Sequence, residues 1–148
     1  MDAEQLIKKS RPFLGWLVEW YNQLPTMALA EAIEEAGGDA KHVAVLAVDV
    51  TTGFCSEGAL SSERVGGIVP PIVQLFQQAH GLGVRHFLLP QDTHTENAVE
   101  FASFPAHCVR GTKEPVTVPE LGELPFADEY VIFEKNSISS DIDTELDA

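Results

Sequence analysis

The stretch HVAVLAVDV, residues 42–50, decides the fold class, because it is an almost unbroken apolar run rich in valine. Such a run is typical of a strand that lies inside a parallel sheet and is buried on both faces. It closes with an acid, Asp49, before the polar loop TTGFCSEGALSS at 51–62. We therefore expect a buried strand whose carboxyl end presents a carboxylate.

Two further apolar runs follow along the chain. They are VRHFLLPQD at 84–92, which ends at an acid, and EYVIFEK at 129–135, which ends at a lysine. A helix is expected over about 64–80. The Pro70-Pro71 pair indicates either that the first part of this helix is irregular or that the regular helix begins at the pair. Strand, helix and strand joined by short turns predict a right-handed parallel α/β unit.

The segments on either side of this unit are expected to be helical. Residues 1–41 form an N-terminal helical extension in this interpretation, with an amphipathic helix over 3–23 that Pro12 would bend or split, and a short helix over 27–36. The domain itself would occupy 42–148. After its third strand, a last helix is expected with Ser139 or Ser140 as N-cap.

Length and charge restrict the classes of partner. The chain has 148 residues, which is room for about one domain. Its 23 Asp and Glu residues against 9 Lys and Arg residues give a net charge of −14, so nucleic acid and anionic membranes are disfavoured partners. Small molecules, metal cations and other proteins remain favoured.

The lack of a recognisable targeting signal and the small number of cysteines favour a reducing compartment. The sequence contains no apolar run of membrane-spanning length, and its first residues, MDAEQLIKKSRP, do not follow the order of a signal peptide. Two cysteines, Cys55 and Cys108, are too few for a disulfide framework. We expect a cytoplasmic protein.

Chemically capable side chains follow each of the three strands. Asp49, Asp92 with His94, and Lys135 would all meet at one edge, because the carboxyl ends of parallel strands lie on the same side of a sheet. A partly buried Asp49 needs a cationic partner such as Lys135. The alternative is that Asp49 only caps a turn, a common role for aspartate after a strand.

Asp92, His94 and His107 are also candidate metal ligands. An aspartate and two histidines leave open positions on a zinc-like or iron-like ion, as a catalytic metal requires. The spacing alone is weak evidence, because an Asp-x-His sequence by itself is more often a turn acid beside a surface histidine. Cys108, next to His107, is either a ligand, a nucleophile or a buried thiol, and we favour the buried thiol.

Three segments, taken in order, resemble the isochorismatase-like cysteine hydrolases, and within them the nicotinamidases. These segments are VAVLAVDVTTGFCSEGAL at 43–60, LLPQDTHTENAVEFASFPAHCVRGTKE at 88–114, and VIFEKNSISS at 131–140. The resemblance implies a three-layer α/β/α sandwich around a parallel, Rossmann-like sheet. The 148 residues would then be the front part of such a domain, truncated after its third strand.

The resemblance also implies roles for individual residues. Asp49 takes the place of the general base and Lys135 that of the catalytic lysine, while Phe54 falls where the substrate is contacted. The metal-binding positions of the nicotinamidases fall on Asp92, His94 and His107, and the expected cofactor is a divalent metal, zinc by preference. The implied reaction converts nicotinamide to nicotinate and ammonia.

One departure from the family pattern leaves other functions open. The nucleophilic cysteine of the family follows the lysine by some tens of residues, and neither Cys55 nor Cys108 occupies that place, so the nucleophile is expected beyond residue 148. An isochorismatase or carbamoyl-amide hydrolase is the alternative of the same class. A non-catalytic metal-binding or assembly module, possible as a homo-oligomer through the aromatic 3–23 helix, is the alternative of another class.

Overall fold

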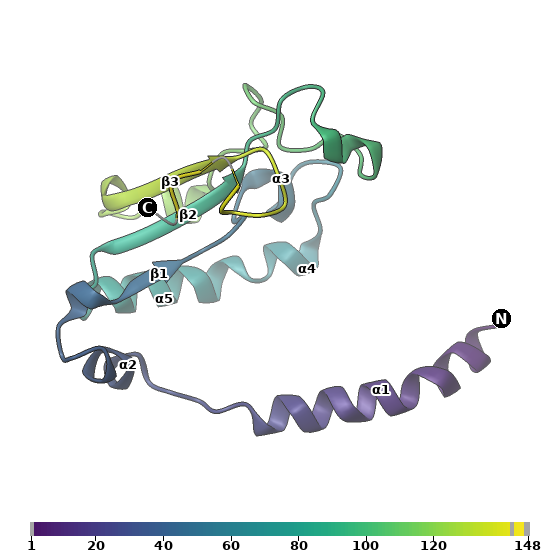
Figure 1. Cartoon of the computed structure of the whole chain (residues 1–148), viewed down its shortest axis with the longest axis horizontal. Coiled ribbons are helices and arrows are strands. Elements are labelled where there is room, and N and C mark those ends of the chain that lie inside the picture. Colours follow the sequence, from purple (N-terminus) through teal and green to yellow (C-terminus); the bar gives the residue numbers. More distant parts are fainter. Residues whose placement is uncertain (1, 143, 147–148) are drawn as a thin grey trace.

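The computed structural model describes residues 2–142 and 144–146. Three parallel strands form one sheet in the order β1 (Ala44–Leu46), β2 (His86–Asp92) and β3 (Tyr130–Lys135), as Figure 1 shows. In this register Asp92, the last residue of β2, pairs with Lys135, the last residue of β3. The α/β prediction with a parallel sheet is confirmed, and aligned strand ends bring the candidate side chains to one edge.

The first strand is shorter than the predicted run of 42–50, but its backbone stays beside β2. The amide of Ala47 donates to the Leu88 carbonyl at 3.0 Å, and that of Asp49 donates to the Pro90 carbonyl at 2.9 Å. Asp49 is therefore held next to the end of β2 although the regular strand has already ended.

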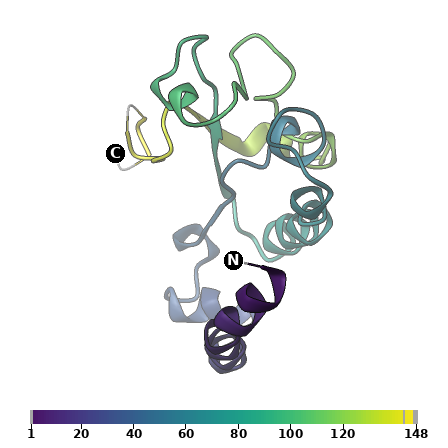
Figure 2. The same cartoon turned by 90° about the vertical axis from the view of Figure 1, so that its right-hand side faces the viewer.

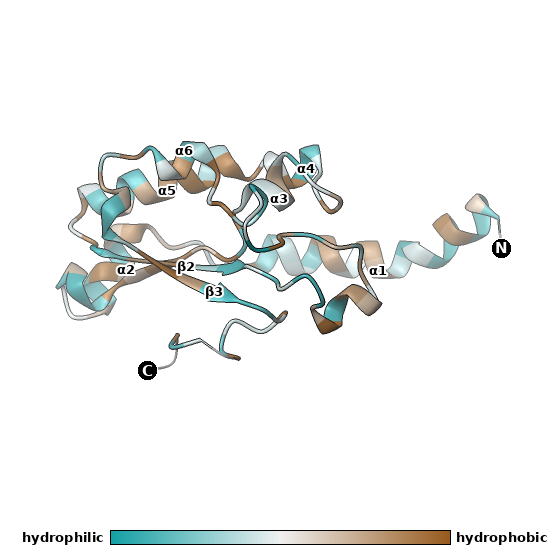
Figure 3. Ribbon diagram, turned by 90° about the horizontal axis from the view of Figure 1, so that it is seen from above, coloured by the Kyte–Doolittle hydropathy of each residue, from teal (hydrophilic) through white to brown (hydrophobic). Residues whose placement is uncertain are grey.

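The core lies between the sheet and two helices, α5 (Val69–Gly81) and α6 (Pro119–Gly122). Figure 3 shows both helices on the same side of the sheet. The fully buried side chains that join the two layers include Phe76, Phe87 and Leu121. Prolines occupy the first turn of α5, where their missing N–H groups would have no partner in the helix, so the predicted helix start at this pair is confirmed.

The other face of the sheet is partly open. Leu46 and Val48 are 52% and 44% exposed, and Val131 on β3 is 46% exposed. The prediction that the first strand is buried on both faces is therefore wrong for the described residues, because α5 and α6 cover only the face that carries Val45 and Phe87.

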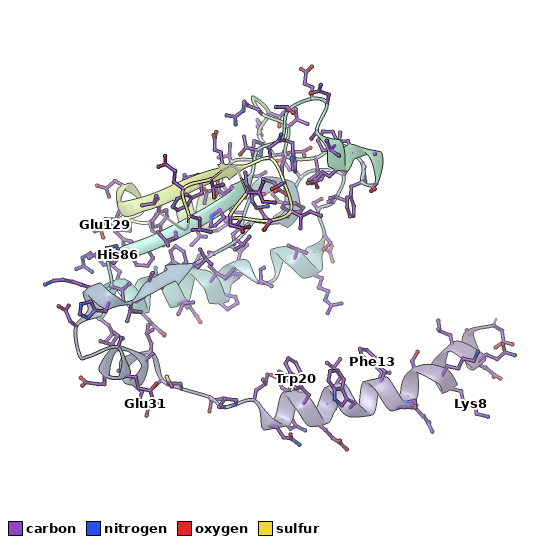
Figure 4. The ribbon with its side chains drawn as sticks, in the orientation of Figure 1. Lys8, Phe13, Trp20, Glu31, His86 and Glu129 are labelled. Carbon is purple, nitrogen blue, oxygen red and sulfur yellow. The ribbon has the colours of Figure 1, made fainter. Side chains whose placement is uncertain are left out.

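The N-terminal extension contains α1 (Ala3–Gln23) and α2 (Leu29–Glu35). Pro12 lies inside α1 without splitting it, because no part of the helix is buried and water can satisfy the carbonyl that loses its N–H partner. None of the side chains in α1 is buried, and Figures 1 and 2 both show the helix standing apart from the sheet. In Figure 4, Phe13 and Trp20 project from one side of α1 and Lys8 from the other.

Shorter elements complete the part of the chain that the structure describes. They are η1 (Ala40–His42), α3 (Thr52–Cys55), α4 (Glu63–Gly66), η2 (Val99–Ala102) and η3 (Ala127–Glu129). No helix in the described ranges combines the length and the apolar character needed to cross a membrane.

The predicted helix after β3 is wrong over the described residues, 136–142 and 144–146, which form bends and turns. Two serine side chains make local bonds here instead of capping a helix, and one of them, Ser139, donates to the Asp141 carboxylate. The Ser137 hydroxyl donates to the Ser139 carbonyl at 2.9 Å. Such local bonds compete with the helical pattern, which explains the failure of the Ser139 or Ser140 cap.

Candidate active site

The edge formed by the strand ends holds one buried cation between two carboxylates. Lys135 is 1% exposed, and its Nζ lies 3.0 Å from Oδ2 of Asp49. The same Nζ donates to Oδ1 of Asp92. The structure thus brings together Asp49, Asp92 and Lys135, which the sequence placed at three separate strand ends.

Asp49 adopts a backbone conformation that aims its carboxylate across the strand ends. Its φ is 58°, in the left-handed region that aspartate tolerates better than most residues. The Asp92 amide donates to Asp49 Oδ1 at 2.9 Å, which leaves Oδ2 facing Lys135. The strained conformation is therefore held by hydrogen bonds at the very place where the carboxylate is presented.

Burial and neighbouring charge set the protonation of this pair. The pKa of the Asp49 carboxyl is raised, first by burial and then by the negative charge of Asp92, with Lys135 acting in the opposite direction. Burial disfavours the charge of Lys135, yet its bond to Asp92 and the charge of Asp49 outweigh this and raise its pKa. The site therefore combines a permanent cation with a carboxyl that takes up a proton more readily than usual.

Four side chains beside Lys135 form a cluster suited to a metal ion. Ligand atoms of Asp92, His94, Glu100 and His107 all lie within 4.8 Å of one another. We call these four residues the metal-type cluster. His94 Nε2 and Glu100 Oε2 are buried without a hydrogen-bond partner among the described residues. Buried polar atoms rarely remain unpaired, so a divalent cation bound by two imidazole nitrogens and two carboxylates fits the cluster.

Glu100 is the member of the cluster that sequence reasoning missed. It lies on η2 within the NAVEF segment, and its two oxygens lie 3.4 Å from Nε2 of His107 and 3.7 Å from Nε2 of His94. No periodic pattern marks a ligand in such a loop. Its signal was an acid between the two candidate histidine ligands, six residues after one and seven before the other.

Backbone pairing carries His107 to His94. The His94 amide donates to the Cys108 carbonyl at 2.9 Å, and the Arg110 amide donates to the His94 carbonyl at 2.8 Å. This short parallel bridge joins the loop after β2 to the segment that contains His107. The two histidines are thus 13 residues apart in sequence, but their rings lie 4.8 Å apart.

Cys108 is a buried thiol, as favoured from the sequence. Its Sγ lies 3.7 Å from the Thr51 hydroxyl and 3.8 Å from the Glu114 carbonyl. Burial is the main reason that its pKa is raised, to about 11. Cys55 is also buried, and neither cysteine lines the pocket at the strand ends.

A pocket of about 190 Å³ lies at the strand ends, and Asp49, Asp92 and Lys135 are among the residues that line it. Its lining combines these charged side chains with an apolar part formed by Phe54, Leu60, Phe104 and Ile138. The ring of Phe54 lies 5.5 Å from that of His107. Phe54, predicted to contact the substrate, is therefore a wall of this pocket.

Fold and site together define an α/β protein with an aspartate–lysine pair and a metal-type cluster at the carboxyl edge of a parallel sheet. Residues 43–148 match the isochorismatase domain. The chain therefore belongs to the isochorismatase family, as its sequence motifs indicated.

Solved structures show the same fold. An isochorismatase-like hydrolase from Alkaliphilus metalliredigens is 32% identical, with a TM-score of 0.61 over 70% of this chain and 57% of that one. A nicotinamidase from Bacillus subtilis is 27% identical, with a TM-score of 0.59 over 70% and 61%. The pyrazinamidase of Pyrococcus horikoshii, solved in complex with zinc, is 22% identical, with a TM-score of 0.58 over 70% and 60%.

The chain thus spans 57% of the length of the Alkaliphilus protein. No curated protein matches the sequence.

Proposed function

We propose that residues 42–148 are the front portion of a metal-dependent amide hydrolase, preceded by a helical extension at 1–41, and that its substrate is nicotinamide. The observation that carries the proposal is the position of Lys135 between Asp49 and Asp92. Asp92 also belongs to the metal-type cluster, so one carboxylate serves both groups. The similarity to a nicotinamidase that is 27% identical supports the choice of substrate.

In this proposal the chain supplies a base and a cation to a thiol nucleophile that follows residue 148. Asp49 accepts the proton of the thiol, and Lys135 stabilises the thiolate. The thiolate attacks the amide carbon, the C–N bond breaks, and Asp49 returns the proton to the departing ammonia. Water then cleaves the thioester to give the acid and restore the thiol. The raised pKa of Asp49 suits a group that must hold and release a proton.

The cofactor that we propose is zinc. Imidazole nitrogens and carboxylate oxygens are ligands that zinc accepts, and the unpaired atoms of His94 and Glu100 are the observation that favours a bound ion. When bound, the metal would orient the ring nitrogen of the substrate or a water molecule. The apolar wall that contains Phe54 and Phe104 would then lie against the flat ring of the substrate.

We also propose a reducing compartment such as the cytoplasm, since both cysteines are free.

The experiment measures ammonia release from nicotinamide and zinc content in the protein isolated from its source. Asp49→Asn and Lys135→Ala are expected to lower the rate by at least about 100-fold. Lys41→Ala, which changes an exposed lysine on η1, is the matched control and leaves the rate unchanged. Full activity in either site variant overturns the proposal. Bound metal without nicotinamide hydrolysis moves the assignment to another amide. Absence of both bound metal and nicotinamide hydrolysis moves it to an isochorismatase or carbamoyl-amide hydrolase.

The second candidate is an assembly role, and the exposed helix α1 favours it. Leu6, Phe13 and Leu17 lie within one apolar side of a helix that buries none of its residues. Pairing of α1 with α1 of a second copy would remove this surface from water. Light scattering would then give a dimer mass for the full chain and a monomer mass after removal of residues 1–28. A monomeric full chain contradicts this role.

A further inference from the structure

The imidazole of His94 is held by a contact on the side away from the metal-type cluster. Its Nδ1 lies 3.2 Å from Oδ1 of Asn136, the residue that follows Lys135. Its Nε2 points into the cluster, 3.4 Å from Asp92 Oδ2 and 3.7 Å from Glu100 Oε2. The two ring nitrogens therefore face different partners.

A second bond decides which atom of the Asn136 amide faces His94. The Thr95 backbone N–H donates to Asn136 Oδ1 at 3.1 Å. A backbone N–H can only donate, so the atom that it meets is the amide oxygen and not the amide nitrogen. Because that oxygen can only accept, the contact with His94 requires a proton on Nδ1.

The tautomer that follows leaves the lone pair of the neutral ring on Nε2, where the cluster needs a ligand. His107 reaches the same state by another route, since its Nδ1 lies 2.8 Å from the Pro105 carbonyl oxygen, which also only accepts. One histidine is thus oriented by the backbone and the other by a side chain. Phe101 packs against both rings, with centroids 5.3 and 5.5 Å away, and restricts their tilt.

We propose that Asn136 is a positioning residue that sets the tautomer and orientation of His94 as a metal ligand. This inference rests on the metal site of the proposed function. The link to Thr95 makes Asn136 effective, because it fixes the amide before any ion binds. A second backbone bond, from Thr93 N–H to the Lys135 carbonyl at 2.8 Å, holds the two strand ends in the same register.

The position of Asn136 connects the two halves of the site. The Lys135 side chain contacts Asp49 and Asp92, while the side chain of the next residue, Asn136, contacts His94 at Nδ1, the ring nitrogen that does not face the metal-type cluster. Consecutive residues after β3 therefore serve the aspartate–lysine pair and the metal-type cluster. A shift of this bend would move both groups together.

The test compares two substitutions in the full-length chain. Asn136→Leu removes the acceptor with little change in size, whereas Asn136→Asp keeps an oxygen that can accept from both donors. The zinc dissociation constant, measured by competition with a chromophoric chelator, is expected to rise about 10–100-fold for Asn136→Leu. It stays at the wild-type value or falls for Asn136→Asp. Asn97→Leu, an exposed asparagine in the same loop region, is the control and binds zinc as the wild type does.

A spectroscopic measurement separates positioning from a general loss of structure. In the zinc-loaded wild-type protein, NMR is expected to show Nδ1–H protons of His94 and His107 that exchange slowly with water. In Asn136→Leu the His94 proton exchanges at least about tenfold faster, while that of His107, bound to the Pro105 carbonyl, is unchanged.

Each outcome bears on the proposal in a defined way. Wild-type affinity in Asn136→Leu overturns the role of Asn136 and leaves the metal site intact. An equal loss of affinity in the Leu and Asp variants also overturns it, since the acceptor would not be what matters. Absence of zinc binding by the wild-type protein overturns the metal site of the proposed function and the inference with it.

Discussion

The carboxylate of Asp92 is shared between Lys135 and the metal-type cluster. Its Oδ1 accepts from Lys135 Nζ, while its Oδ2 lies 3.4 Å from His94 Nε2 and 3.6 Å from His107 Nε2. This residue ends β2, and its register partner across the sheet is Lys135 itself. A single side chain thus joins two functional groups because two parallel strands end at the same level.

Asp92→Asn is expected to damage both groups at once. It removes a charged metal ligand, so zinc binding should weaken by more than about tenfold. It also removes a charged partner of buried Lys135, which should lower the unfolding free energy of the metal-free protein by about 1–3 kcal/mol. Zinc competition and urea denaturation in the presence of a chelator measure the two effects. Asp128→Asn, an exposed aspartate on η3, is the control. Loss of one property without the other would contradict the shared role.

Lys135→Met is expected to destabilise the metal-free protein in a pH-dependent manner. The folded-state pKa of Lys135 is raised above 10.5, so its contribution is complete at neutral pH and is lost only as pH rises through that folded value. Without this cation, Asp49 and Asp92 repel each other, and the pKa of Asp49, which burial and the charge of Asp92 already raise, loses the opposing effect of Lys135. The variant should therefore lose about 3 kcal/mol at pH 8 and less at pH 5.

Urea denaturation at the two pH values measures this difference, with Lys41→Met as the matched exposed lysine. The same cost at pH 5 and pH 8 would show that the carboxylates do not repel each other in the variant.

Cys108 is expected to be unreactive in the folded protein. Burial raises the pKa of its thiol to about 11, so almost no thiolate is present at pH 8. Iodoacetamide at pH 8, followed by mass spectrometry, should leave Cys108 unmodified until urea unfolds the chain. Rapid labelling of the folded protein would instead make Cys108 a candidate nucleophile and would weaken the case for a thiol beyond residue 148.

Gly53→Ala is expected to disturb the contact between α3 and the loop that carries Cys108. A Cβ at this glycine would lie 2.7 Å from Cys108 Sγ and 2.9 Å from Glu114 Cβ. The expected loss of unfolding free energy is about 1–3 kcal/mol. Gly122→Ala, where nothing lies within 4 Å of the added carbon, is the control and should stay within about 1 kcal/mol of the wild type. Equal stability of the two variants would mean that α3 shifts without cost.

The sequence by itself determined the sheet and the strand-end residues. Apolar runs that end at Asp49, Asp92 and Lys135 are local patterns, and the parallel arrangement follows from the strand–helix–strand order. Aligned strands then bring their last residues to one edge whatever the details of packing. His107 was a candidate ligand from its side-chain chemistry alone, and the family resemblance then gave it a metal-binding position.

Only the tertiary structure decided which loop residues complete the site. Glu100 and Asn136 lie outside every strand, and no periodic pattern marks either of them as a partner of His94. Their contacts depend on how η2 and the bend after β3 fold back on the strand ends, which nonlocal hydrogen bonds such as Thr95 N–H to Asn136 Oδ1 fix. The open face at Leu46 has the same cause, since local patterns show that a residue is apolar but not which element covers it.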